Sequence, residues 1–220
     1  MKSQGESVWF FYLAEIALRR LGNRILNYIY RHNSSGTSAG NIHEAIINFE
    51  DQAAGWLSSL PPALKLEDEI NENAALKFIL KGHLLDCYEM MYWPFIVDGI
   101  HAKPLTTISE AFTRKGLQTC VERIRKNESG FYHRHHGTWL MLRSCTRSAL
   151  VLIAAARSPT LSSLLPTAWE LAVYKVIDML SHWKNDSKDV SDRLQIIEIL
   201  MSSSAFGAPS SKFQISNLLT

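Results

Sequence analysis

The residues best suited to chemistry in this chain lie close together in the stretch GFYHRHHGTWLMLRS, residues 130–144. It contains three of the eight histidines, His133, His135 and His136, just before a strongly apolar run. Imidazole side chains bind transition metals and act as general bases near neutral pH. If this stretch were helical, His133 and His136 would share a face while His135 pointed elsewhere. At most two of them would then reach one metal ion.

The rest of the sequence does not complete such a site. A catalytic zinc takes three protein ligands, and the HExxH spacing is absent from the sequence. His83, His101 or a distant carboxylate could supply a further ligand, but nothing in the sequence requires it. The chain also contains neither a GxGxxG turn nor a P-loop pattern for binding phosphate. We therefore predict no catalytic residue, no metal and no cofactor.

The three cysteines, Cys87, Cys120 and Cys145, are an odd number at wide spacings. This argues against a disulfide framework and against a structural zinc site. A cysteine inside an apolar helical pattern is usually a small core residue, so we expect no catalytic thiol. This use of cysteine favours a reducing compartment, either nuclear or cytoplasmic.

Charge and hydropathy exclude two further classes of partner. The net charge is +2, from 23 basic and 21 acidic residues spread along the chain, so no face is expected to neutralise many phosphates. The most apolar region, residues 138–156, contains Arg143 and Arg147 near its middle, and such charges are costly at the centre of a bilayer. We predict a buried helix of a soluble protein there, and no membrane partner.

Arg143 and Arg147 lie four residues apart on one side of this otherwise apolar helix, where buried guanidinium groups would need partners. In a structural interpretation they pair with carboxylates or carbonyls of neighbouring helices. In a functional interpretation they line a pocket with aromatic walls and a charged anchor. The candidate residues of that ligand or partner pocket are Tyr132, His133, His135, His136, Trp139, Arg143 and Arg147.

Helices must position these residues, because apolar side chains recur at steps of three and four in segments separated by polar or proline-containing turns. The predicted helices span residues 8–31, 42–60, 74–93, 108–126, 130–158, 167–183 and 193–201. Asn41 and Glu44 form a predicted capping box before the second, and Pro94 should kink or end the third. In the first, the apolar residues are Trp9, Tyr12, Leu13, Ile16, Leu18, Leu21, Ile25, Leu26 and Ile29. In the sixth, the side chains expected to face inward are Trp169, Leu171, Val173, Val176, Ile177 and Leu180.

Residues 149–156 are apolar on all sides, the pattern of a helix surrounded by other helices. We therefore predict an all-α fold: a single domain, residues 1–201, of about seven helices around this buried central helix. Residues 202–220 are at first rich in Ser, Gly and Pro, which predicts a disordered tail.

Five segments, taken in order, resemble a known family: FFYLAEIALRRLGNRI, AGWLSSLPPAL, GHLLDCYEMMYWPFI, YHRHHGTWLMLRSCTRSALVLIAAA and WELAVYKVIDMLSHW. They are similar to the C-terminal part of the helical regulatory domain of fungal zinc-cluster transcription factors, the fungal-specific transcription factor domain or middle homology region. The resemblance covers about residues 7–200. It rests on the ordered set, since no single motif would suffice.

In full-length members of this family a six-cysteine zinc cluster reads DNA and the helical region regulates activity. This sequence has three scattered cysteines, no basic recognition segment and no heptad linker, so direct sequence-specific DNA binding is not expected to carry over. The front of the helical domain is also expected to be missing. The resemblance implies that HRHHGTWL is the entry to a central helix, where the histidines hydrogen-bond and cap while Trp139 packs.

The function implied is that of a non-enzymatic regulatory and interaction module, a shortened fungal regulator of secondary metabolism. It would act through a protein partner or a small-molecule effector, and a homodimer is compatible with it. Two alternatives stay open. One is a stand-alone helical enzyme or small-molecule binder using an inter-helix pocket, with His133, His135 or His136 as general base. The other is a decayed gene product whose unpartnered apolar faces make it aggregate.

Overall fold

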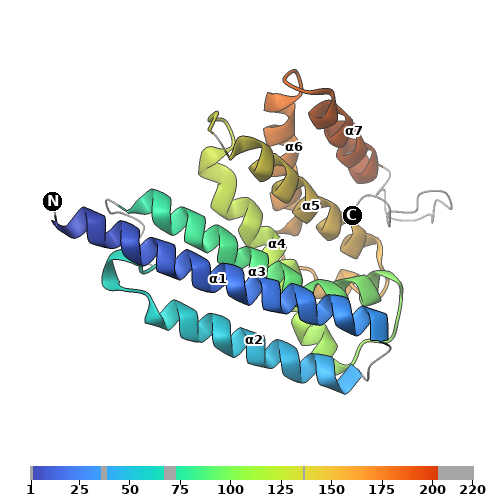
Figure 1. Cartoon of the computed structure of the whole chain (residues 1–220). Coiled ribbons are helices and arrows are strands. Elements are labelled where there is room, and N and C mark those ends of the chain that lie inside the picture. The colour runs from blue at the N-terminus through green and yellow to red at the C-terminus, as the bar shows by residue number, and fades with distance from the viewer. Residues whose placement is uncertain (1, 36–38, 67–72, 136, 203–220) are drawn as a thin grey trace. The chain divides into compact units, whose positions relative to one another are not determined.

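A computed structural model describes residues 2–35, 39–66, 73–135 and 137–202 of the 220-residue chain. Within these residues the regular secondary structure is helical and there is no strand (Figure 1), so the prediction of an all-α fold is confirmed. The α-helices are α1 (Lys2–Ser35), α2 (Ala39–Ser59), α3 (Ala74–Ile100), α4 (Thr107–Asn127), α5 (Thr138–Arg157), α6 (Trp169–Trp183) and α7 (Lys188–Ser202). The prediction of a disordered tail covers residues 202–220; Ser202 is the last residue of α7, and residues 203–220 lie outside the described residues.

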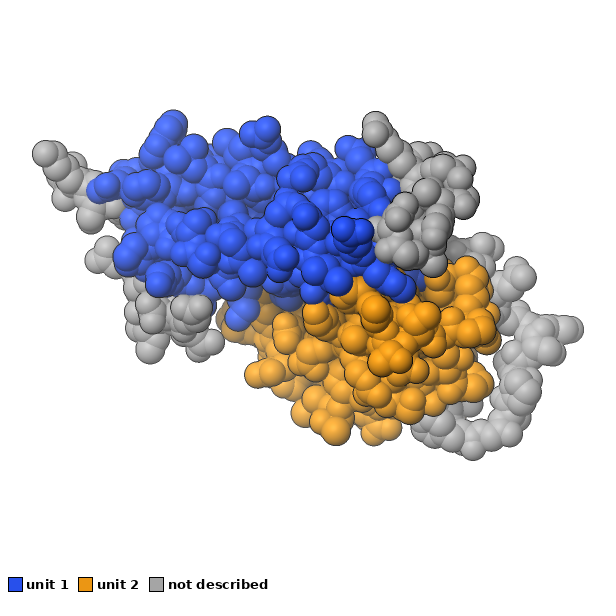
Figure 2. All heavy atoms as spheres, turned by 90° about the horizontal axis from the view of Figure 1, so that it is seen from below, with its two compact units in different colours: residues 1–94 blue, residues 95–220 orange. Residues whose placement is uncertain are grey.

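The chain divides by packing into two compact units, residues 1–94 and 95–220 (Figure 2). The boundary follows Pro94, which lies inside α3. Unit 1 therefore contains α1, α2 and most of α3, and unit 2 contains the end of α3 and α4 to α7. A proline within a helix removes one backbone hydrogen bond, yet the helix continues to Ile100. The alternative in which this helix ends at Pro94 is wrong.

Unit 1 is held together by apolar faces of its helices and by hydrogen bonds between them. Trp56 of α2 donates its indole N–H to the carbonyl of Ala14 in α1 at 3.0 Å. Tyr92 of α3 donates its hydroxyl to the Glu50 carboxylate of α2 at 2.5 Å. A buried apolar cluster connects the same elements, and it comprises Phe11, Ala14, Leu60, Leu64 and Leu80.

Unit 2 is organised around α5, which packs against α4, α6 and α7. Every residue from Ser148 to Ala155 is buried. Burial of the apolar surface on all sides of this segment is the main favourable contribution to folding here, since free energy follows the apolar area removed from water. The prediction of a buried central helix agrees with this arrangement.

By length and composition alone α5 could cross a membrane. In this structure 72% of its most apolar window is buried by other parts of the chain, and the core helix of a soluble protein passes the same test. The helix is therefore only weak support for a membrane span.

Several predicted boundaries are wrong. α5 begins at Thr138, because residues 131–135 and 137 form turns, a bend and irregular backbone rather than α-helix. α2 already begins at Ala39, so Asn41 lies within the helix and is not its N-cap.

In α6, Leu171 is 60% exposed, whereas Met179 is buried. The inward stripe of α6 is narrower than the set of its apolar residues, and it comprises Ala172, Val173, Val176, Met179, Leu180 and Trp183.

Gly99, near the end of α3, lies against the core of unit 2. A Cβ atom on Gly99 would lie 2.2 Å from Cδ2 of the buried Leu161, and the Gly99 carbonyl accepts a hydrogen bond from the Ser158 hydroxyl at 3.0 Å. We expect Gly99→Ala to lower the free energy of unfolding by about 1–3 kcal/mol, because the neighbouring core must shift. Urea denaturation followed by circular dichroism measures this change.

Gly55 provides the matched control, since a Cβ there would meet no atom within 4 Å on the exposed side of α2. Gly55→Ala should raise the free energy of unfolding by about 0.5–1 kcal/mol, because alanine favours the helix interior. An equally stable Gly99→Ala variant would contradict the packing described for unit 2.

Candidate functional site

The histidine-rich stretch forms the turn that leads into α5. The backbone N–H of His135 donates to the Thr138 hydroxyl at 2.8 Å, and that hydroxyl donates to the carbonyl of His135 at 2.7 Å. The N–H of Gly137 donates to Nδ1 of His135 at 3.1 Å. His135 thus takes part in the hydrogen bonds that shape the entry to the helix. Such local pairing satisfies polar groups that a helix start leaves without intrahelical partners.

The other histidines do not join it in a metal site. His133 is exposed and His136 lies outside the described residues. His83 lies in unit 1, 3.5 Å from a carboxylate oxygen of Glu15 and 3.5 Å from one of Asp86. Among the residues that the structure describes, no three His, Cys, Asp or Glu side chains are placed to hold one metal ion.

Aromatic rings gather around Trp183 at the end of α6. Its indole N–H donates to the carbonyl of Phe131 at 2.6 Å, and its ring centroid lies 6.5 Å from that of Trp139 in an edge-on arrangement. The guanidinium of Arg134 lies 5.1 Å from the Trp183 ring, a favourable distance for a cation–π contact. The exposed Tyr132 contacts the ring of His182 edge-on at 5.3 Å. This cluster fixes the turn before α5 against α6.

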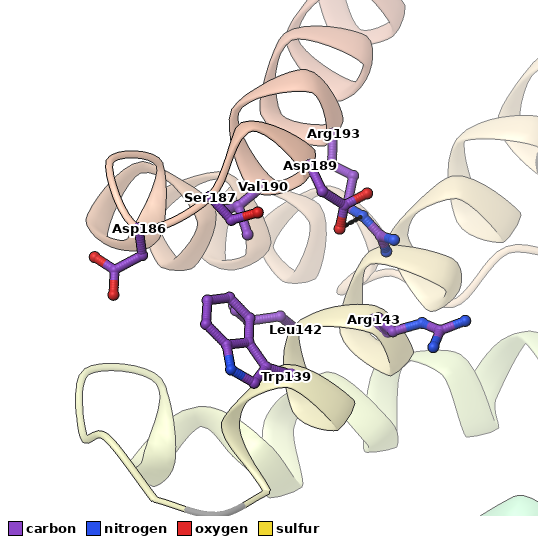
Figure 3. Close-up of a pocket in the computed structure, with 8 residues that line it drawn as sticks. All are labelled: Trp139, Leu142, Arg143, Asp186, Ser187, Asp189, Val190 and Arg193. Atoms are coloured by element: carbon purple, nitrogen blue, oxygen red, sulfur yellow. Dashed lines mark hydrogen bonds and ion pairs between the residues drawn. The ribbon is translucent and has the colours of Figure 1, made fainter.

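A pocket of about 400 Å³ opens between the first turns of α5 and the first turns of α7 (Figure 3). Figure 3 shows the Trp139 ring extending from α5 toward Ser187, in the turn before α7, and Val190, in the first turn of α7. Trp139 and Arg143 are the members of the predicted pocket that line it. Its full lining is Trp139, Leu142, Arg143, Asp186, Ser187, Asp189, Val190 and Arg193.

The charged groups of this pocket differ in their pairing. Asp189 accepts a hydrogen bond from Nε of Arg193 at 2.9 Å, and Asp186 forms an ion pair with Arg134. No described residue forms a hydrogen bond or ion pair with the side chain of Arg143. The pocket therefore combines a tryptophan wall with one uncompensated positive charge.

The prediction that Arg143 and Arg147 are buried is wrong, because both are exposed. With Trp139, they recur every four residues along α5, which places the three side chains on one solvent-facing stripe. The side of α5 that carries these three residues is therefore open to solvent in the first half of the helix, whereas other helices cover the second half on all sides.

Sequence reasoning missed the part of the pocket that α7 and the turn before it contribute. Asp186 and Asp189 lie more than 40 positions from Trp139 along the chain, and helical periodicity carries no information on which helices meet. No sequence signal would have found this pairing.

A second surface also differs from expectation. The apolar residues of α1 lie on two sides of the helix instead of forming one stripe. The buried residues are Phe11, Ala14, Leu18, Leu21, Ile25 and Ile29. Six of the described large apolar residues of α1 are exposed. Leu26 lies apart, ten residues beyond Ile16, and the other five are Val8, Trp9, Tyr12, Leu13 and Ile16. We call these five residues the α1 apolar face.

One serine pattern lies outside the candidates named above. The segment GTSAG, residues 36–40, matches the GxSxG pattern of serine hydrolases. In those enzymes the serine occupies a sharp turn between a strand and a helix. Here the element before the segment is α1, a helix, and residues 36–38 lie outside the described residues. Among the described residues, no strand precedes the segment as that chemistry requires.

These features define an all-α protein of two helical units with a pocket in unit 2 and an exposed apolar face in unit 1. Comparisons with models of protein families, with curated proteins and with solved structures find no match to this chain. The resemblance to the fungal regulatory domain therefore stays a prediction.

The pKa of Cys87 in unit 1 is strongly raised. Its thiol donates to the carbonyl of Leu18 at 3.8 Å, and it is buried between α3 and α1. Burial, and to a smaller extent the negative charge of Asp86, raises the pKa of Cys87 from 9.0 to about 12. A thiol of this kind is a poor nucleophile at neutral pH, since the thiolate is the reactive form.

This pKa predicts a stability change at high pH. In the unfolded chain Cys87 ionises near its ordinary pKa of 9.0, whereas the folded protein keeps the proton up to about pH 12. The stabilising effect of the neutral thiol is complete below pH 9.0 and is lost as pH rises toward 12. Urea denaturation at about pH 8 and about pH 10.5 should show a smaller loss of stability in Cys87→Ala than in wild type. Equal losses would contradict the assignment.

Proposed function

We propose that this chain is a non-enzymatic regulatory and interaction module, related to the regulatory domain of fungal zinc-cluster transcription factors and acting through protein contacts. The observation that carries the proposal is the α1 apolar face, whose side chains are between 40% and 62% exposed. Contiguous exposed apolar patches of this kind mark interaction surfaces.

The face is separate from the packing that folds unit 1. Positions 9, 12, 13 and 16 recur at steps of three and four, so they form one stripe along the helix. Phe11, Ala14 and Leu18 lie on the opposite side and are buried. Exposing Trp9 and Tyr12 is costly unless a partner covers them, and these residue types are enriched among those that dominate binding energy.

In this proposal the chain does not read DNA itself. The ordered resemblance over about residues 7–200 supports a role in regulating transcription, in the nucleus or in the cytoplasm, with secondary metabolism as the process regulated. The three cysteines are each buried and none forms a disulfide, which supports a structural role for them over that of zinc ligands.

The proposal is tested by fusing the full chain to a heterologous DNA-binding domain and measuring a reporter gene in fungal cells. We expect the fusion to change reporter output severalfold and the variant Trp9→Ala/Ile16→Ala to lose most of this change, because the α1 apolar face is reduced. The matched control is Leu171→Ala on α6, which also removes an exposed apolar side chain, and it should behave as wild type. A well-expressed, folded fusion that leaves the reporter unchanged would refute the regulatory function.

A second candidate function, binding of a small-molecule effector, is favoured by the pocket in unit 2. Its volume of about 400 Å³ lies within the range of small-molecule sites, about 300–1,000 Å³. Trp139 offers an apolar wall and Arg143 a charge without a partner among the described residues. The ligand class that fits is a flat apolar carboxylate. No described histidine lines this pocket, so a histidine general base has no place in this candidate.

Thermal unfolding with benzoate and with the uncharged benzamide tests this second function. Benzoate should raise the unfolding midpoint of wild type more than benzamide does, because a ligand that binds the native state stabilises it. Arg143→Gln should weaken benzoate binding about tenfold, the effect of one charged hydrogen bond. Arg147→Gln, four residues along the same exposed side, is the matched control. Equal responses to benzoate and benzamide would contradict a role for Arg143.

A further inference from the structure

We propose that the α1 apolar face is covered by the same face of a second copy of this chain, with the two α1 helices antiparallel. This inference rests on the proposed function and deepens it, because it names the partner of the interaction surface. A two-fold interface uses one patch twice, so a single self-complementary face is sufficient to form it.

The charges beside the face separate along α1. Glu6 stands on the N-terminal side and Arg20 on the C-terminal side, and both side chains are exposed. Within the described residues neither forms an ion pair, whereas the neighbouring Arg19 is already paired with Glu15 at 2.7 Å. Among the described residues, the helix therefore carries an acid without an ion-pair partner at one end of its apolar face and a base without one at the other.

This charge separation selects the orientation of the pair. If two α1 helices were parallel, Glu6 would face Glu6 and Arg20 would face Arg20, and both contacts would be repulsive. In an antiparallel pair Glu6 of each copy faces Arg20 of the other, so two attractive contacts form. Exposed ion pairs add little affinity, but charge complementarity sets orientation and register.

The same register brings the apolar side chains together. A helix rises about 1.5 Å per residue, so in an antiparallel pair the numbers of facing residues have a constant sum. Pairing Glu6 with Arg20 sets the crossing point at Leu13, which then faces its own copy. Trp9 of one copy lies within about one residue, or 1.5 Å along the axis, of the level of Ile16 in the other. The face thus covers itself from Trp9 to Ile16.

The experiment is size-exclusion chromatography with light scattering on the full chain, from about 1 µM to about 100 µM. We expect the mass of a dimer at the upper end and, for Ile16→Lys, a dissociation constant at least tenfold higher. The matched control Leu171→Lys places the same charge on an exposed leucine of α6 in unit 2 and should leave the dimer unchanged. Circular dichroism establishes that both variants are folded.

A charge exchange tests the orientation. Glu6→Arg and Arg20→Glu should each raise the dissociation constant about fivefold, because each replaces two attractive contacts by repulsive ones. The double variant Glu6→Arg/Arg20→Glu should return to a value near wild type. In a parallel pair the single exchanges would leave the like-charge contacts in place, so a double variant with no restoring effect would overturn the antiparallel arrangement.

A wild-type chain that stays monomeric over the whole range would overturn this inference, as would a dimer unaffected by Ile16→Lys. These failures are distinguishable from failure of the proposed function. A monomer whose fused form still changes the reporter through Trp9 would mean that the face binds a different protein. A dimer whose fused form leaves the reporter silent would retain the interface and refute the regulatory function.

Discussion

The all-round burial of the second half of α5 is the constraint on which unit 2 depends. An apolar helical segment with no polar side must be enclosed by other helices, and α4, α6 and α7 enclose it. The first turns of α5 extend beyond this enclosure, which leaves Trp139 and Arg143 accessible. The pocket lies there, where the start of α7 passes the uncovered side of α5.

The histidine-rich turn contains side chains that could bind a metal or transfer protons, but its hydrogen bonds shape the local structure. His135 participates in local hydrogen bonds with Thr138 and Gly137 that form the entry to α5. Trp183 anchors the same turn from α6 through the carbonyl of Phe131. Aromatic packing and hydrogen bonding to the backbone thus account for much of this segment. The side chains available for binding, Trp139 and Arg143, lie on the first turns of α5 that follow.

Unit 1 differs from unit 2, because its helix α1 has apolar side chains both on its buried side and on its exposed side. The buried residues pack against α2 and α3, and Trp56 and Tyr92 connect the three helices by hydrogen bonds. The second side carries Trp9 and Ile16 into solvent. A helix that needed only to fold would gain nothing from these side chains, and for that reason the surface, rather than the pocket, carries the main functional proposal.

The sequence by itself determined the all-α class, the central place of α5 and the approximate spans of the helices, because periodicity and turn residues act locally. Tertiary structure decided which apolar side of α1 is buried, that Leu171 and Arg143 face solvent, and that the start of α7 meets Trp139. It also decided the division of the chain after Pro94. These properties depend on which helix surfaces pack together over long separations in sequence, and the pattern of one helix does not contain that information.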